Sequence, residues 1–95
     1  MSKHNEKILK NLKFTVQVVI LNSEGKVLAV SRKDDHTNMG LVGGKVEPED
    51  ASLEAALIRE VKEETGLTIY EKDLVQIFSM YKDGYMGYAY LCAYF

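Results

Sequence analysis

The chain has 95 residues, 46% of them hydrophobic, and a single Pro, a composition typical of one globular domain rather than of a disordered segment. Its formal net charge of -2, from 12 basic and 14 acidic residues, offers no basic surface to a nucleic-acid backbone, so we expect no duplex DNA or RNA partner. Cys92 is the only cysteine, which excludes a disulfide framework, and no segment resembles a signal peptide or a membrane span. We therefore predict a cytoplasmic protein with no membrane partner.

The first half of the chain is typical of strands and turns. A polar leader occupies residues 1–13. Apolar residues alternate in FTVQVVIL, which predicts a strand, and the turn formers NSEGK separate it from VLAVSR, so residues 14–32 indicate a hairpin. KDDHTN, residues 33–38, is interpreted as an exposed loop, and LVGGKVE then brings two adjacent glycines.

The second half of the chain contains one predicted helix. Residues 52–64 favour helix, with Ser52 at the start, Leu57 and Val61 in an apolar stripe, and Gly66 as the C-terminal cap. After it, LTIY, LVQIFSMY and YMGYAYLCAYF are rich in strand-forming residues, and KDG is a turn between the last two. The order of strands, one helix and further strands predicts an α+β fold.

Three glutamates, Glu60, Glu63 and Glu64, lie close together on the predicted helix. At helical spacing their side chains share one face and repel one another, which lowers stability unless a cation offsets the charge. Carboxylate oxygens without thiolate or imidazole suit Mg²⁺ or Mn²⁺ rather than zinc or copper, and such an ion binds phosphate oxygens. The alternative is a solvated acidic surface, in which Arg59 and Lys62 form ion pairs with the glutamates.

The segment GGKVEPEDASLEAALIREVKEETGL, residues 43–67, resembles the Nudix box. That box has Gly, five residues, Glu, seven residues, and then Arg-Glu-apolar-any-Glu-Glu-any-Gly-apolar. Residues 59–67 match its second half at every position. The flanking strands also resemble the family's mixed β-sheet sandwich around one catalytic helix. The resemblance implies a Nudix domain of the α+β class over residues 14–95.

The resemblance also implies roles for residues of the helix. Glu60, Glu63 and Glu64 are expected to hold Mg²⁺, with Mn²⁺ as a substitute. Glu60 is expected to orient or deprotonate the attacking water. Arg59 is expected to position the glutamates through charge-assisted hydrogen bonds, the alternative being a surface ion pair.

Substrate contacts are expected from several further residues. Gly43, Gly44 and Lys45 are expected to line the phosphates, although a solvated loop lysine is an equal interpretation of Lys45. Arg32, with Tyr81 and Tyr85, is a candidate for nucleoside contact, and the alternatives are a surface arginine and tyrosines packed along a strand.

The resemblance implies an enzyme with a nucleotide-type small-molecule substrate. The implied reaction is Mg²⁺-dependent hydrolysis of the pyrophosphate bond of a nucleoside diphosphate linked to another group. The substrate stays open among oxidised nucleoside triphosphates, ADP-ribose-like compounds and dinucleoside polyphosphates. The alternative is a nucleotide-binding regulatory module of the same fold that turns over little or nothing.

The chain departs from the family pattern in three places. The loop between Gly44 and Arg59 is one residue longer, so either Asp50 or Glu49 replaces the first acid of the box. Val42 stands where many relatives have Pro. Relatives usually continue into another strand and a second helix that covers the sheet, and we expect this chain to lack that part. YAYLCAYF would then be an uncovered edge strand through which the chain self-associates.

Overall fold

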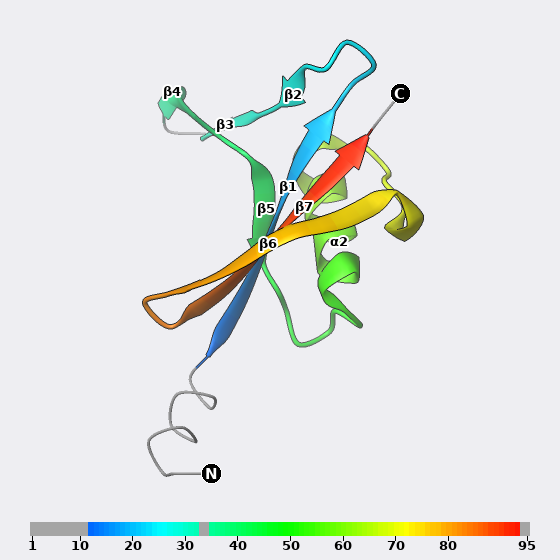
Figure 1. Cartoon of the computed structure of the whole chain (residues 1–95). Helices are drawn as coiled ribbons and strands as arrows, with labels where there is room; N and C mark the ends of the chain where they lie inside the picture. The colour runs from blue at the N-terminus through cyan, green and yellow to red at the C-terminus, as the bar shows by residue number, and fades with distance from the viewer. Residues whose placement is uncertain (1–11, 33–34, 94–95) are drawn as a thin grey trace, which may run out of the picture.

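The computed structural model describes residues 12–32 and 35–93. Its elements are, in order, β1 (Lys13–Leu21), β2 (Val27–Leu28), β3 (Val30–Arg32), β4 (Asp35–Gly40), β5 (Val42–Lys45), α2 (Leu53–Thr65), the 3₁₀ turn η1 (Glu71–Asp73), β6 (Leu74–Lys82) and β7 (Tyr85–Ala93). This order of strands, a helix and further strands confirms the predicted fold class (Figure 1).

A mixed five-stranded sheet forms the body of the molecule. The strand order is β2-β1-β7-β6, and β5 also pairs with β1. β1 and β7 run parallel, whereas β1 is antiparallel to β2 and β5, and β6 is antiparallel to β7. β7 therefore has both edges paired, and the prediction that the last strand is an uncovered edge is wrong. β6 is the edge strand on this side of the sheet, because the long-range pairing of β1 with β7 takes up the second edge of β7.

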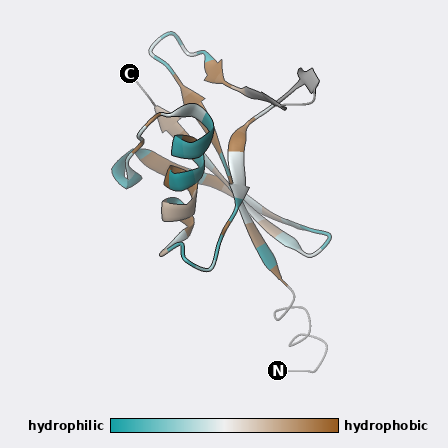
Figure 2. Ribbon diagram, turned by 180° about the vertical axis from the view of Figure 1, so that it is seen from behind, coloured by the Kyte–Doolittle hydropathy of each residue, from teal (hydrophilic) through white to brown (hydrophobic). Residues whose placement is uncertain are grey.

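α2 packs across one face of this sheet and has hydrophilic residues on its outward side (Figure 2). The Oγ of Ser52 caps the helix by accepting a hydrogen bond from the N–H of Ala55 at 3.0 Å. Gly66 ends it in the left-handed conformation at φ 78°, which a residue with a Cβ rarely adopts. The predicted C-terminal cap is confirmed, and Ser52, the predicted first residue of the helix, is its N-cap. Within the residues described, no helix is long and apolar enough to cross a membrane.

The hydrophobic core lies between α2 and the sheet. Strand alternation directs one face of β1 and β7 toward apolar side chains of α2 and of the segment after it. The buried residues of this core are Val16, Val18, Ile20, Val42, Ala56, Leu57, Val61, Ile69, Tyr90 and Cys92. The thiol of Cys92 is therefore a packed core group, as its apolar sequence context predicts.

Two local predictions are wrong. Residues 35–38 are not a loop but part of β4, which pairs with β3 in a separate two-stranded sheet. Backbone pairing forms this ribbon, so a polar sequence does not reveal it. LTIY is not a strand but irregular chain before η1, and its apolar character reflects Ile69, which is 2% exposed. Most of the predicted polar leader, together with residues 33–34 and 94–95, lies outside the described residues.

Candidate active site

Two adjacent glycines bring β5 into contact with both β1 and α2. Gly44 pairs with Val16, on the side of the sheet that faces α2. A Cβ at Gly44 would lie 2.5 Å from Cδ of Glu60 and 2.7 Å from each of its carboxylate oxygens. A Cβ at Gly43 would collide with the backbone of Val16 and Gln17. Glycine therefore allows the carboxylate of Glu60 to lie directly against the β5 backbone.

Arg59 is the centre of a hydrogen-bond network around these glycines. Its Nε and Nη2 donate to the two carboxylate oxygens of Asp50, each at 2.9 Å. Nη1 donates to Oε1 of Glu60 at 3.0 Å and to the carboxylate of Glu63 at 3.3 Å. Nη2 also donates to the carbonyl oxygen of Lys45 at 3.1 Å. Arg59 thus connects the loop before α2, the helix itself and β5, and its forked contact with Asp50 is the geometry that fixes a guanidinium most firmly.

Asp50, not Glu49, is the acid of the preceding loop that contacts Arg59. Besides the contact with Arg59, Oδ2 of Asp50 accepts a hydrogen bond from the N–H of Glu47 at 2.8 Å. The hydrogen bonds from Arg59 and then from Glu47 hold the pKa of Asp50 below its usual value. Glu49 is exposed, and its side chain makes no hydrogen bond within the described part of the chain. The N–H of Asp50 also donates to the carbonyl oxygen of Glu47 at 3.0 Å, which closes a turn in the loop before α2.

The three predicted metal ligands do not converge on one point. The side chain of Glu60 is 14% exposed and lies beside Glu64, whereas that of Glu63 is 59% exposed and turned toward Arg59. Partial burial, followed by the hydrogen bond and the charge of Glu60, raises the pKa of Glu64, although the backbone of Gly43 acts in the opposite direction. Across residues 12–32 and 35–93, no three acidic, histidine or cysteine side chains are placed to hold a metal ion together.

The carboxylates of α2 beside β5 nevertheless fit a hard divalent cation. Its donors are oxygens only, which is the set that Mg²⁺ and Mn²⁺ prefer. Partial burial, and then the hydrogen bond and charge of Glu60, raise the pKa of Glu64, and a cation beside the two carboxylates would favour the ionised form of both. Glu60 and Glu64 would therefore hold the ion, and Glu63 would join them only by leaving Arg59.

The ammonium of Lys45 lies away from the glutamates. Its Nζ is 5.9 Å from the ring centroid of Tyr85, and Nζ of Lys13 is 5.7 Å from the same centroid. Lys45 pairs with Thr15, so strand alternation places its side chain on the face of the sheet opposite Glu60. The backbone carbonyl of Lys45, but not its ammonium, therefore belongs to the network around Arg59.

The candidates for nucleoside contact are also dispersed. Arg32 belongs by its backbone to β3, in the two-stranded ribbon rather than in the sheet that carries the glycines. Tyr81 is 53% exposed near the end of β6, and Tyr85 lies beneath the two lysines. Their contact with a substrate stays a prediction.

One contact at this helix was not anticipated from the sequence. The hydroxyl of Tyr90 donates a hydrogen bond to Oε2 of Glu54 at 2.9 Å, joining β7 to the first turn of α2. Burial, assisted by Glu54, raises the pKa of Tyr90 to about 12. The alternation that places Tyr90 on the same strand face as Cys92 was the signal, because a buried tyrosine hydroxyl needs a polar partner.

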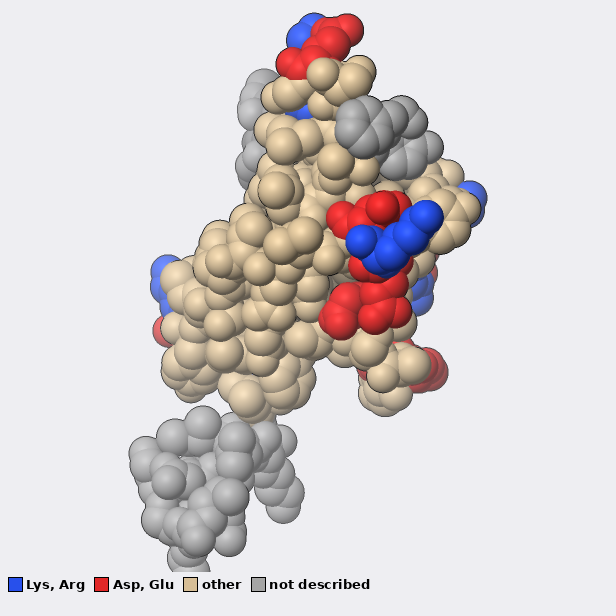
Figure 3. Space-filling model, turned by 45° about the vertical axis from the view of Figure 1, so that its right-hand side comes forward, with Lys and Arg blue, Asp and Glu red and all other residues tan. Residues whose placement is uncertain are grey.

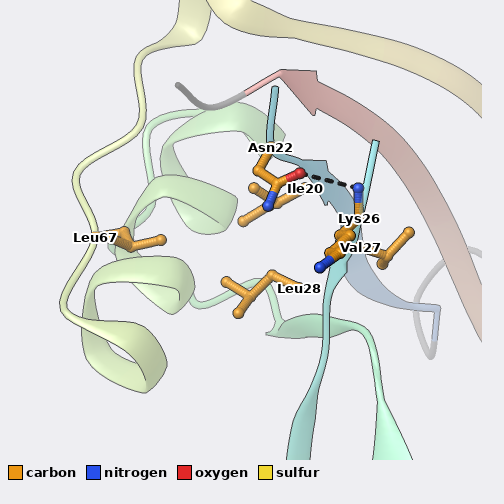
Figure 4. A pocket seen from close by; sticks show the side chains of 6 residues that line it. All are labelled: Ile20, Asn22, Lys26, Val27, Leu28 and Leu67. Carbon is orange, nitrogen blue, oxygen red and sulfur yellow. Dashed lines mark hydrogen bonds between the residues drawn. The ribbon is translucent and has the colours of Figure 1, made fainter. Parts of the chain in front are cut away.

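A separate hollow lies beside the C-terminal end of α2 (Figure 4). It has a volume of about 210 Å³ and is lined by Ile20, Asn22, Lys26, Val27, Leu28 and Leu67. Oδ1 of Asn22 accepts a hydrogen bond from the N–H of Lys26 at its rim, at 2.9 Å. Because this lining contains no carboxylate, the hollow is distinct from the acidic site.

Comparison with known proteins identifies the family. A model of the NUDIX domain matches residues 11–93, a range that includes β5, α2 and the whole network around Arg59. The chain belongs to the NUDIX family. Among curated proteins, no match was found.

Solved structures of NUDIX proteins share the fold. A MutT/nudix family protein from Enterococcus faecalis is 27% identical with a TM-score of 0.73, over 98% of this chain and 44% of that one. A nudix hydrolase family member from Chromobacterium violaceum is 28% identical with a TM-score of 0.67, over 85% and 50%. The MutT protein from Methanosarcina mazei Go1 is 31% identical with a TM-score of 0.60, over 86% and 62%. The chain thus spans about half of the length of these NUDIX structures.

Proposed function

We propose that this NUDIX protein hydrolyses the pyrophosphate bond of a nucleoside diphosphate linked to another group, with Mg²⁺ as cofactor and Mn²⁺ as a substitute. The contact between Gly44 and Glu60 carries the proposal, because it holds a largely buried carboxylate against a strand backbone beside a second carboxylate, Glu64. Family membership and the hydrolase named among the similar structures support it. The substrate would be a small nucleotide-type molecule in the cytoplasm.

Each residue of the network has a role in this proposal. Arg59 holds one oxygen of Glu60 and so fixes the direction of a carboxylate that would orient the attacking water and accept its proton. Asp50 fixes Arg59 in turn and is a positioning residue. When bound between Glu60 and Glu64, the cation supplies positive charge against the phosphoryl oxygens.

A product screen tests the proposal. The chain would be incubated with a panel of nucleoside diphosphate derivatives, with Mg²⁺, with Mn²⁺ and with a chelator, and nucleotide products would be separated and quantified. We expect metal-dependent release of a nucleoside monophosphate from at least one compound. Binding by calorimetry without any turnover would instead support the regulatory module.

A substitution assigns the chemistry to Glu60. Glu60→Gln keeps size and helix propensity but removes the anion, so we expect turnover to fall by roughly 10²-fold to 10³-fold or more with little change in thermal stability. Glu49→Gln, an exposed carboxylate in the preceding loop, is the matched control and should retain wild-type turnover. Near-normal turnover in Glu60→Gln would remove this residue from the mechanism.

A further inference from the structure

Two contacts hold α2 on strands that lie on opposite sides of β1. On one side, the carboxylate of Glu60 lies against the β5 backbone at Gly44. On the other side, the hydroxyl of Tyr90 in β7 donates a hydrogen bond to Oε2 of Glu54 at 2.9 Å. Gly44 and Tyr90 belong to strands that pair with β1 from its two edges. The helix is therefore attached on both flanks of the strand that it crosses.

The spacing of Glu54 and Glu60 along α2 makes these two contacts depend on each other. Leu57, which is fully buried beneath the helix, lies midway between them in sequence. At roughly 100° per residue, each glutamate lies about 60° around the helix from Leu57, and the two lie on opposite flanks. A rotation of α2 that lifted Glu60 from β5 would press Glu54 against β7. The reverse rotation would pull Glu54 away from Tyr90.

The hydrogen bond from Tyr90 can fix this rotation more sharply than apolar packing can. The hydrophobic effect has no preferred direction, whereas a hydrogen bond weakens steeply when it is bent. Tyr90 is 3% exposed, so water competes little for its hydroxyl. Burial raises the pKa of Tyr90 to about 12, so the hydroxyl keeps its proton at neutral pH and remains a donor. Figure 3 shows other acidic side chains gathered around basic ones on the surface, where an ion pair restrains a helix less.

We propose that Tyr90 is a positioning residue for the acidic site: through Glu54 it sets the rotation of α2 and thereby the place of the Glu60 carboxylate against β5. A turn of about 10° moves a group that lies about 5 Å from the helix axis by nearly 1 Å. A side chain that takes part in chemistry has to be held within about 0.5 Å of its productive place. The consequence for hydrolysis rests on the proposed function, whereas the position of the helix does not.

Hydrogen exchange measured by NMR tests the position of α2 without metal or substrate. The backbone N–H of Gly43 forms a hydrogen bond with Glu64, so its exchange rate reports the contact between α2 and β5. Tyr90→Phe should raise this rate by about tenfold more than that of the Val18 amide in the core of β1, because only the local contact opens. Glu54→Ala should have the same effect. Glu54→Gln keeps an oxygen that accepts the hydroxyl proton and should match the wild type.

Tyr88→Phe is the matched control. It removes the hydroxyl of a tyrosine on the same face of β7, which packs against the core and makes no side-chain hydrogen bond within residues 12–32 and 35–93. Exchange at Gly43 should therefore stay at the wild-type rate. Equal acceleration of Gly43 and Val18 in Tyr90→Phe would show a general loss of stability. That result, an unchanged rate at Gly43, or an equal effect of Tyr88→Phe would overturn the proposal.

Turnover separates this inference from the proposed function. With a substrate that the wild type hydrolyses, Tyr90→Phe should lower kcat by about tenfold with little change in KM, because the displaced group acts in the reaction rather than in binding. Glu54→Gln should retain the wild-type kcat. If the wild type hydrolysed no compound, the proposed function would fail, while the exchange rates would still decide the position of α2. Faster exchange at Gly43 with an unchanged kcat would remove Tyr90 as a positioning residue.

Discussion

The two faces of the central sheet are made from the same strands but differ in how far their side chains are buried. On the face beneath α2, alternate residues of β1 and β7 are buried, and Tyr90 satisfies its hydroxyl through Glu54. On the other face, Val75, Phe78 and Met80 of β6 are each more than half exposed in the part of the chain that the structure describes. The hydrogen-bond network around Arg59 lies at the border of the covered face. Packing against one side of a carboxylate therefore fixes its direction. A carboxylate on an exposed surface lacks that constraint.

The largest expected contrast is in stability. Leu57 is fully buried beneath the sheet, so Leu57→Ala should lower the free energy of unfolding by about 2–5 kcal/mol. Phe78→Ala removes a larger side chain from the other face, yet should cost less than about 1 kcal/mol, because that side chain is mostly in solvent already. Urea denaturation measures both values. Similar losses would mean that the other face is covered in the folded protein.

A second contrast compares two glycines. Gly44→Ala places a methyl group against the carboxylate of Glu60 and should cost about 1–3 kcal/mol as the strand or the helix shifts. Gly40→Ala is the control, since a Cβ there meets no atom within 4 Å, and its effect should be near zero. Denaturation curves of the two variants give the difference. If they were equal, the close approach of β5 to Glu60 would not exist in solution.

A third prediction concerns the pH dependence of the Asp50 contact. The folded-state pKa of Asp50 is lowered, so its ionised form stabilises the fold above the ordinary value of 3.8, and this stabilisation is lost as the pH falls through the lowered pKa. Asp50→Asn should therefore melt at a lower temperature than the wild type at pH 7. The difference should shrink below pH 3.8. Glu49→Gln should match the wild type throughout a series of thermal melts, and a pH-independent difference for Asp50→Asn would contradict the ion pair.

The smallest expected effect is at Glu64. Its pKa is raised, so its ionised form opposes folding and the stability that the protonated form provides is lost as the pH rises through the raised pKa. Without metal, Glu64→Gln should slightly raise the melting temperature at neutral pH. Saturating Mg²⁺ should raise that of the wild type more than that of the variant, because binding to the native state stabilises it. An unchanged wild-type melting temperature with Mg²⁺, beside a higher one for Glu64→Gln, would mean that the acidic face is only surface.

Local signals account for what could be predicted from the sequence. Ser52 and Gly66 delimit α2 because caps act on the backbone next to them, and the turn at Asp83 and Gly84 takes the positive φ values that its residues favour. The alternation of β1 correctly indicates its buried face. The spacing of Glu60 and Glu64 likewise places both on one side of the helix, which the structure confirms.

What could not be predicted depends on partners distant in sequence. The pairing of β7 with β1 decides which strand is the edge, and composition does not encode it. The side chain of Lys45 points away from Glu60 because of strand register, which a motif does not specify. Glu63 is turned toward Arg59 rather than toward the other glutamates, and Asp50 rather than Glu49 meets Arg59. The positions of Glu63 and Asp50 follow from competition among neighbouring charges and hydrogen bonds in three dimensions.

The parallel pairing of β1 with β7 also governs how the chain reaches its fold. Nine residue pairs connect the first described strand to the last, and closing so long a loop is entropically unfavourable until much of the structure is in place. A ribosome would therefore release most of the domain before its sheet can close. During that interval the apolar residues of β1 and α2 lack their partner strand, and we expect the nascent chain to be a substrate for chaperones that bind exposed hydrophobic segments.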